Sequence, residues 1–326
     1  MPSSAFVRYN VALLVCSVLL LSVGAAGLWG LHRTGRLPAP PITATNCIDE
    51  KFKFLHNADL DDRNLVAVGS SVTWRNLDFA TTEGRWPQMR PINAAPCYLK
   101  VHETAFLTRF YLDNMPQARV VLSIFAMRDF ERCEGTGAFF NTRDAEAYVF
   151  EDQEAWHLYF QNFTPLSFVR DALALPSMRS GAATHAPLVM DKYGSGPLEI
   201  TPPEIRNDVR TTPDCFDHLS AMARELKARG IAWVVVLFPP MPAWIAHYDP
   251  GAVRDGAWRE AVAERLAGTG ATLIDGRGGP MFEDRHFTDP AHLHWAYTPA
   301  FTRWIFGRLD RGGALTATFN GAPNAL

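Results

Sequence analysis

Residues 212–238 read TPDCFDHLSAMARELKARGIAWVVVLF and carry the clearest structural pattern in the chain. Pro213 suits the first turn of a helix, the apolar residues after it share one helical face, and Gly230 suits the helix end. Residues 231–238 then have the β-branched composition of a buried strand. The stretch therefore predicts a helix followed by a strand, which is the repeating unit of a parallel sheet.

Short apolar runs elsewhere in the chain alternate with helical patterns in the same way. Further strands are predicted at residues 64–68, 91–94, 118–125 and 271–275. Further helices are predicted at about residues 98–112, 257–266 and 295–309. This alternation predicts an α/β fold with a central parallel sheet, right-handed crossovers and helices on both faces.

Residues 134–210 interrupt the alternation. The segment is aromatic, punctuated by Pro and Gly, and much longer than an ordinary connection. It follows the third predicted strand, and ligands of open parallel sheets bind beyond the carboxyl ends of the strands. We therefore expect an inserted lobe that shapes a substrate cleft.

Residues 11–31 carry no charge, and as a helix they would reach about 30 Å, enough to cross a bilayer core. The competing interpretation is a cleaved secretory signal, with small residues around Gly24, Ala25 and Ala26 as the processing site. We favour an uncleaved anchor in residues 1–32, because the apolar run continues past that site. In either case, we expect the rest of the chain to be exported from the cytoplasm.

Residues 33–46 are rich in Pro, Thr and Ala, which predicts a tether that lifts the domain off the membrane. Residues 47–326 are long enough for one enzyme-sized domain. A formal net charge of -3 without a basic stripe argues against nucleic-acid binding. This part contains four cysteines, Cys47, Cys97, Cys133 and Cys215. They either form two disulfides, as in an oxidising compartment, or remain ordinary buried thiols.

Gly69, Ser70 and Ser71 follow the first predicted strand, where a turn of small residues exposes the Ser71 hydroxyl. Alone, this sequence is typical of a solvated turn with a serine cap. Asp289 and His292 lie near the other end of the chain, three positions apart, so that one turn can direct both side chains to one cleft. Because an imidazole oriented by a carboxylate can take the proton of a serine hydroxyl, these three residues form a predicted catalytic set.

Histidines and carboxylates near this pair also allow a metal site as an alternative. Its candidate ligands are Asp284, His286, Asp289, His292 and His294. Nothing elsewhere in the sequence supplies a matching second cluster, whereas the serine hypothesis accounts for Asp289 and His292 together. We therefore expect neither a metal nor a cofactor.

The segment Gly69-Ser70-Ser71-Val72-Thr73 resembles the Gly-Asp-Ser-x-Thr block of the SGNH (GDSL-type) hydrolases, and residues 289–292 (DPAH) resemble their Asp-x-x-His block. Weaker blocks occur in the family's order at residues 92–95 (INAA) and 121–129 (VLSIFAMRD). The resemblance implies a flavodoxin-like three-layer α/β/α fold and cofactor-free acyl transfer through a serine ester. Ser70 replaces the family's acid, as in the membrane-anchored or exported branch that resembles D-alanyl-lipoteichoic acid and alginate O-acetylation proteins.

The resemblance also suggests which residues contact the substrate or its oxyanion. Asn93 belongs to the second block and Arg128 stands in place of the third-block asparagine, so both are candidates beside Ser71. The Arg128 guanidinium can donate to an oxyanion, bind an acidic substrate or pair with Asp129. The second-block glycine has no clear counterpart, although a backbone N–H near Cys97 or Tyr98 can replace it.

The expected function is O-acyl transfer or acyl-ester hydrolysis outside the cytoplasm, on a cell-surface or exported polysaccharide. The resemblance implies a single-pass anchor in the inner membrane, a catalytic domain in the periplasm, and an integral-membrane acyl donor protein as a partner. The alternative is a non-catalytic module that positions polysaccharide for an acetylation or export complex, and Arg128 and the missing glycine motivate it.

Overall fold

The computed structural model describes residues 4–43, 45–151, 153–183, 186–205, 207–311 and 314–319. Its centre is a five-stranded parallel sheet with the strand order β2-β1-β3-β4-β5. The strands are β1 (Leu65–Ala67), β2 (Pro91–Asn93), β3 (Val120–Phe125), β4 (Ala232–Leu237) and β5 (Thr272–Asp275). Every residue of β3 is buried, as expected for a parallel strand that is covered on both faces. The predicted α/β fold around a parallel sheet is confirmed.

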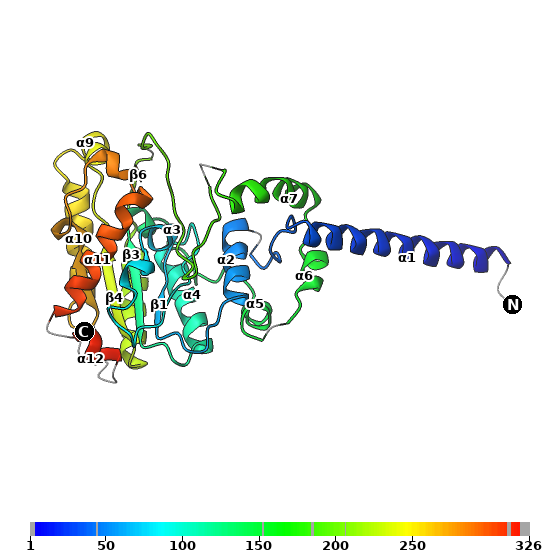
Figure 1. Ribbon diagram of the computed structural model, residues 1–326, viewed down its shortest axis with the longest axis horizontal. Helices are drawn as coiled ribbons and strands as arrows, with labels where there is room; N and C mark the ends of the chain where they lie inside the picture. The colour runs from blue at the N-terminus through cyan, green and yellow to red at the C-terminus, as the bar shows by residue number, and fades with distance from the viewer. Residues whose placement is uncertain are drawn as a thin grey trace.

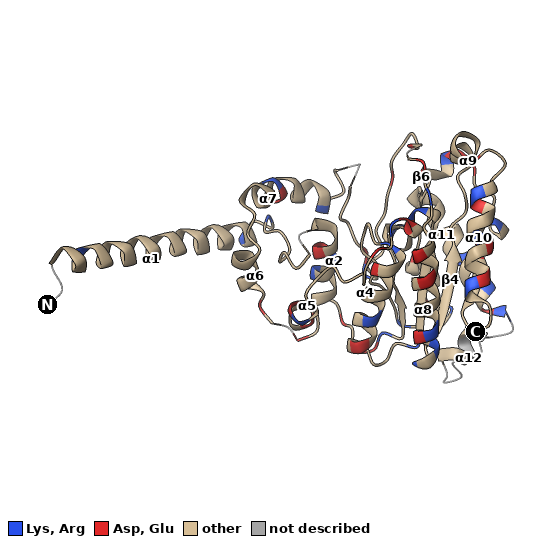
Figure 2. Ribbon diagram, turned by 180° about the vertical axis from the view of Figure 1, so that it is seen from behind, with Lys and Arg blue, Asp and Glu red and all other residues tan. Residues whose placement is uncertain are grey.

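Helices cover the sheet on both sides (Figures 1 and 2). α8 (Pro213–Ala228) packs against α4 (Val101–Asn114), α10 (Val253–Leu266) and β4 on one face. α11 (Thr298–Leu309) lies on the opposite face. Gly230, two residues after the end of α8, has a φ of 69°, which is the left-handed conformation that ends a helix before β4.

Shorter elements lie in the connections around the sheet. They are α2 (Asn46–His56), α3 (Ser71–Arg75), α9 (Pro242–Tyr248), α12 (Ala314–Phe319) and the antiparallel pair β6 (Phe287–Asp289) and β7 (His292–Leu293). Five 3-10 turns are also described, at Phe79–Thr82, Met127–Phe130, Gly276–Gly278, Asp284–His286 and Trp295–Tyr297.

The described residues of the segment 134–210, between β3 and α8, form three helices joined by long loops. The helices are α5 (Thr142–Val149), α6 (Trp156–Gln161) and α7 (Pro165–Arg179). They lie at the end of the body from which α1 (Ser4–Arg33) projects as a single rod (Figure 1). α1 is long and apolar enough to cross a membrane, and its side chains are almost all exposed, so the predicted N-terminal apolar helix is confirmed at the level of length and composition.

Residues 34–43 have no regular secondary structure, yet they are packed against α2, and we call them the strap. Leu37, Ala39 and Ile42 are buried. The Ala39 N–H donates to Glu50 at 3.0 Å, and the Thr43 N–H donates to Asp49 at 2.8 Å. The sequence predicts a tether here. In the structure the Ala39 and Thr43 N–H groups bond to carboxylates of α2, and the Leu37 side chain packs with Leu28 and Tyr159.

Two disulfides are present in the structure. Cys47 bonds to Cys97, with 6.1 Å between their Cα atoms, and Cys133 bonds to Cys215, with 5.0 Å. The first joins α2 to the loop after β2, and the second joins the start of the 134–210 segment to α8. Of the two alternatives left open by the sequence, the structure has paired cysteines.

Candidate active site

The turn after β1 presents Ser71 at the first position of α3. Gly69 is required in this turn, because a Cβ there would overlap the Thr73 side chain. Ser70 caps α3 by accepting a hydrogen bond from the Val72 N–H at 3.1 Å, and its hydroxyl donates to Asp129 at 2.8 Å. Ser70, the residue before Ser71, is therefore held by hydrogen bonds to both Val72 and Asp129.

Ser71, His292 and Asp289 form one continuous chain of hydrogen bonds. The Ser71 Oγ lies 2.9 Å from His292 Nε2, and His292 Nδ1 lies 2.8 Å from Asp289 Oδ2. The other Asp289 oxygen accepts the Ala291 N–H at 2.8 Å. Asp289 and His292 face each other across the β6–β7 pair, so a tight hairpin brings together the two side chains that the sequence places three positions apart.

Asn76 joins the serine helix to the β6–β7 hairpin. This fully buried residue follows α3, and its amide donates to the carbonyls of Val72 at 2.8 Å and Ala291 at 2.9 Å. Its Oδ1 accepts the Leu293 N–H at 2.8 Å. Sequence reasoning missed Asn76, because an asparagine just after a short helix has an ordinary capping role and its partners lie far along the chain.

The carboxylates of the site lie in different electrostatic environments. Burial acts to raise the pKa of Asp289, but the charge and hydrogen bond of His292, the Ala291 N–H and the charge of Arg128 together hold that pKa below its usual value. Burial raises the pKa of Asp129 to about 6, although hydrogen bonds from Ala126 and Ser70 oppose the shift. Asp289 is thus ionised at neutral pH, as an orienting partner of His292 must be.

A cleft of about 690 Å³ opens at the carboxyl edge of the sheet beside these residues. Besides the Ser71–His292–Asp289 set, its lining includes Trp74, Arg75, Tyr98, Arg128, Glu204 and Trp244. The structure thus brings Arg128 to the same cleft as Ser71. Asp129 points elsewhere, since its carboxylate bonds to Ser70 and to the Ala126 N–H.

Asn93 has a different environment from the one expected for a substrate contact. Its side chain is fully buried, and its amide donates to the Trp74 carbonyl at 3.1 Å and more weakly to Thr73 and Ser195. Its backbone carbonyl accepts a hydrogen bond from Nζ of the buried Lys51 at 3.0 Å. Asn93 therefore joins β2 to α3 below the site, because all its polar atoms face the interior.

The loop after β2 approaches the site through its backbone. Tyr98 has a φ of 64°, a left-handed conformation that is uncommon outside glycine, and it lines the cleft together with Cys97. The disulfide to Cys47 holds this loop against α2. The backbone near Cys97 and Tyr98, which the sequence suggested as a replacement for the missing glycine, is thus at the cleft.

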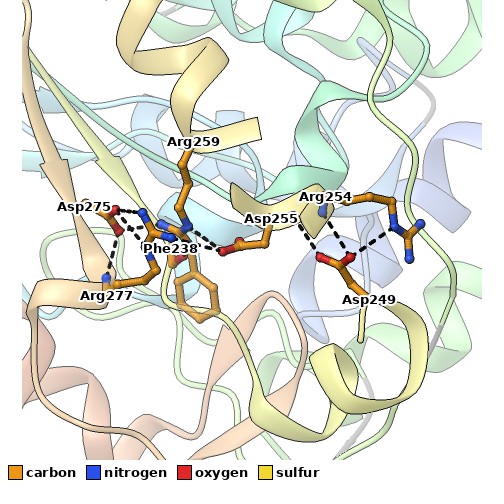
Figure 3. Close-up of polar contacts among 7 residues, drawn as sticks. All are labelled: Phe238, Asp249, Arg254, Asp255, Arg259, Asp275 and Arg277. Carbon is orange, nitrogen blue, oxygen red and sulfur yellow. Dashed lines mark hydrogen bonds and ion pairs between the residues drawn. The ribbon is translucent and has the colours of Figure 1, made fainter. Parts of the chain in front are cut away.

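A network of ion pairs supports the cleft wall beyond β4 (Figure 3). Arg259 is buried and bonds to Asp255 at 2.8 Å and to Asp275 at 2.7 Å, and it also donates to the Phe238 carbonyl at 2.6 Å. Phe238 and Asp255 both line the cleft. The network therefore fixes the turn that leaves β4.

The alternative metal ligands are occupied by other contacts. His286 Nδ1 accepts the Glu283 N–H at 2.8 Å, and His294 Nδ1 accepts the Ala296 N–H at 3.3 Å. Within the part of the chain that the structure describes, no three His, Cys, Asp or Glu side chains are grouped as metal ligands. The geometry at His292 is accounted for by its contacts with Ser71 and Asp289.

The chain was also compared with known proteins. No protein-family model, curated protein or solved structure matches it.

Proposed function

We propose that this chain is a serine-dependent O-acyltransferase or acylesterase that acts outside the cytoplasm on a cell-surface or exported polysaccharide. The observation that carries the proposal is the unbroken hydrogen-bonded chain from the Ser71 hydroxyl through His292 to the ionised Asp289. A nucleophile, a base and an orienting carboxylate in this geometry are what acyl transfer through a serine ester requires.

The reaction would proceed in two steps. The Ser71 oxygen attacks the acyl carbonyl carbon while His292 Nε2 takes the hydroxyl proton, and the proton then passes to the departing alkoxide as the ester bond breaks. In the second step an acceptor hydroxyl, or water, loses its proton to His292 and attacks the acyl-serine. Ser71 regains a proton, and the acyl group leaves as a new ester or as a free acid.

Three groups are candidates for stabilising the oxyanion. The Ser71 N–H is in the first turn of α3, where a helix has no carbonyl of its own to accept it. The backbone at Tyr98 and the guanidinium of Arg128 approach from other sides of the cleft. Preorganised donors of this kind contribute strongly to acyl transfer, because they bind charge that develops only in the transition state.

We further propose a flavodoxin-like three-layer arrangement with α1 as a single-pass anchor in the inner membrane. The strand order β2-β1-β3-β4-β5 supports the arrangement, and Ser71 follows β1, where the chain leaves toward opposite sides of the sheet. The two disulfides support folding in an oxidising compartment such as the periplasm. An integral-membrane acyl donor protein is proposed as a partner that α1 would place beside the catalytic domain.

A fluorophosphonate probe tests the nucleophile directly. We expect it to label the wild-type chain at Ser71 and to leave the Ser71→Ala variant unlabelled. Ser180→Ala removes an exposed serine that is not among the residues lining the cleft and serves as the matched control, with labelling expected to equal that of the wild type. If the folded wild-type protein resists the probe but still binds glycan, the non-catalytic binding module becomes the better description.

A second experiment separates transfer from hydrolysis. The purified chain is given an activated acetyl ester with and without an oligosaccharide acceptor. A transferase should release the activating group faster when the acceptor is present and should yield acetylated sugar. A rate that does not depend on the acceptor would favour a plain esterase.

A further inference from the structure

The segment 156–166, which comprises α6, its connection to α7 and the first two residues of α7, lies against the base of α1, and we call it the collar. Its inner side packs on α1 and the strap, where Tyr159 joins Leu28 and Leu37 in a small apolar cluster. The Tyr159 hydroxyl donates to the Pro38 carbonyl at 2.6 Å. These contacts fix the position of the collar along the axis of α1, near its C-terminal end (Figure 1).

Contacts on either side strengthen this attachment. The Asn162 amide donates to the Pro41 carbonyl at 2.9 Å. At the far end of α7, Arg179 donates to the carbonyls of Gly35 and Leu37 and forms an ion pair with the largely buried Glu50. The strap and α7 thus make one unit with α2, so the collar cannot move independently of the catalytic domain.

The outer side of the collar exposes large apolar side chains. Phe160, Phe163 and Leu166 are 57%, 50% and 88% exposed, and Trp156 is also on the surface. Single exposed apolar residues are ordinary, but four within one short turn-rich segment are not, because burying them from water would be favourable. Arg170, four residues after Leu166, is exposed as well and lies 3.5 Å from the Asp171 carboxylate.

The position of α1 identifies what covers this surface. The span from Tyr9 to Trp29 measures about 30 Å as a helix, which equals the thickness of a bilayer hydrocarbon core. Both aromatic residues are exposed, and aromatic side chains at both ends of a span are typical of residues at the membrane–water interface. The Arg33 guanidinium lies over the Trp29 ring, 5.2 Å from its centroid, as expected near lipid headgroups.

Trp156, the first residue of the collar, lies close to the part of α1 where the membrane–water interface is expected. Its ring lies 6.4 Å from that of His32, one turn beyond Trp29 on α1. A bilayer that surrounds α1 up to Trp29 therefore ends at the level of the collar. In Figure 2, α1 and α6 are almost free of charged residues, whereas α8 and α10 carry many.

We propose that the collar is a second membrane contact, with Trp156, Phe160, Phe163 and Leu166 inserted in the interfacial region of the bilayer that α1 crosses. The catalytic domain would then be fixed in height and orientation at the membrane surface. This proposal goes beyond the serine chemistry and does not depend on it.

The test uses the full chain with both disulfides intact, reconstituted in vesicles of phosphatidylcholine and phosphatidylglycerol without any other protein. A polarity-sensitive fluorophore is attached to one cysteine at a time. Quenching is measured separately with lipids that carry a nitroxide near the headgroup and with lipids that carry it on the acyl chain. The natural Cys16, exposed on α1, reports insertion of the rod. In a Cys16→Ala background, Phe163→Cys, Leu166→Cys and Leu173→Cys report the collar and α7, and Met281→Cys is the matched aqueous control.

We expect labels at positions 163 and 166 to show emission at shorter wavelength and several-fold stronger quenching than the label at Met281. That residue is 96% exposed and precedes β6, which lies far from α1 (Figure 1). Quenching at position 173 should be weaker than at 166, because α7 runs from the base of α1 back over the body.

Two results would overturn the proposal. Labels at 163 and 166 that behave like the one at 281, while Cys16 is quenched from within the bilayer, would show that the collar faces water and favour a protein partner. A Cys16 label that is not reached by acyl-chain nitroxides would remove the anchor on which the collar argument depends. Agreement between positions 163 and 166 guards against a local disturbance by either substitution.

Discussion

In the proposed reaction, the single carboxylate of Asp289 sets the state of the imidazole next to Ser71. It holds His292 Nδ1 at 2.8 Å, which leaves Nε2 to face the serine hydroxyl. The lowered pKa of Asp289 keeps this oxygen negative when the imidazole takes a proton. The stability that ionised Asp289 contributes should be present above pH of about 4 and be lost as pH falls through its lowered folded pKa.

Replacing Asp289 by Asn tests this role. The Asn side chain keeps the shape but favours the wrong imidazole tautomer, so kcat for ester cleavage should fall on the order of 10³–10⁴-fold. The substrate contacts remain, so KM should change little. Asp214→Asn alters an exposed carboxylate at the start of α8 and should leave kcat unchanged. A similar loss in both variants would argue against an orienting role for Asp289.

Asp49 at the base of the strap predicts a pH dependence of stability. Burial raises its pKa to about 7, although Thr43 hydrogen bonds to its carboxylate oppose the shift. The unfolded value is about 4, so between about pH 4 and 7 the folded chain binds more protons than the unfolded one. The contribution of Asp49 to the free energy of unfolding should therefore decrease as pH rises through this window.

Asp49→Asn should flatten this pH dependence, because the amide oxygen can still accept the Thr43 hydrogen bonds without a charge. Denaturant unfolding at several pH values checks the prediction. The exposed Asp61→Asn variant is the matched control and should keep the wild-type slope. An unchanged slope in Asp49→Asn would mean that other groups produce it.

At the scale of elements, α3 and the β6–β7 hairpin must keep a fixed distance for Ser71 to reach His292. Asn76 provides three hydrogen bonds between or within them. In Asn76→Ala the buried partners are left without hydrogen bonds, at a cost of about 1–3 kcal/mol in unfolding free energy. Activity should fall further than stability alone explains, with kcat reduced and KM nearly unchanged.

Asn114→Ala is the control for Asn76→Ala. Asn114 is the last residue of α4, and its amide donates to the Phe110 carbonyl of the same helix, so this contact does not join two elements. Its removal should leave kcat unaltered. If Asn76→Ala retained full kcat in the folded protein, the spacing of the two elements would have another cause.

Arg259, like Asn76, links separate elements through buried polar contacts, and it holds the turn after β4. Arg259→Met leaves the buried Asp255 without its closest cation, and breaking a buried pair from one side costs about 3–5 kcal/mol. The control Arg265→Met breaks an exposed ion pair with Asp217, and we expect it to lower the unfolding free energy by about 0–1 kcal/mol. Thermal or denaturant unfolding of both variants measures these losses. Equal costs would show that the network does not stabilise the cleft wall.

For the whole molecule, the sequence was sufficient for features with a local pattern. The helix and strand in residues 212–238 appear as α8 and β4, because their periodicity, Pro213 and Gly230 act within the segment itself. Ser71, Asp289 and His292 could be proposed together because Ser71 follows the first predicted strand and the other two come after the last one, and a parallel sheet brings these positions to one edge. The apolar rod was evident from composition alone.

Other features depend on partners far along the chain. The Ser70–Asp129 bond, the Asn76 contacts and the Lys51–Asn93 contact join positions that carry no shared local pattern. Asn93 belonged to a motif-like block yet faces the interior, because a short strand can direct a polar side chain to either side. The strap had the composition of a flexible tether, and its packing depends on distant partners that include Asp49, Glu50, Tyr159, Asn162 and Arg179.

The central claim is that Ser71 carries the acyl group. The most direct test is mass spectrometry of the full chain after brief incubation with an activated acetyl ester and an acid quench. We expect one acyl group per chain on the peptide that contains Ser71. This group should be lost when an acceptor sugar is added and should be absent from Ser71→Ala. An acyl group on another residue during ester turnover would contradict the role of Ser71. Ester turnover with no acylated intermediate in either the wild type or Ser71→Ala would contradict it as well.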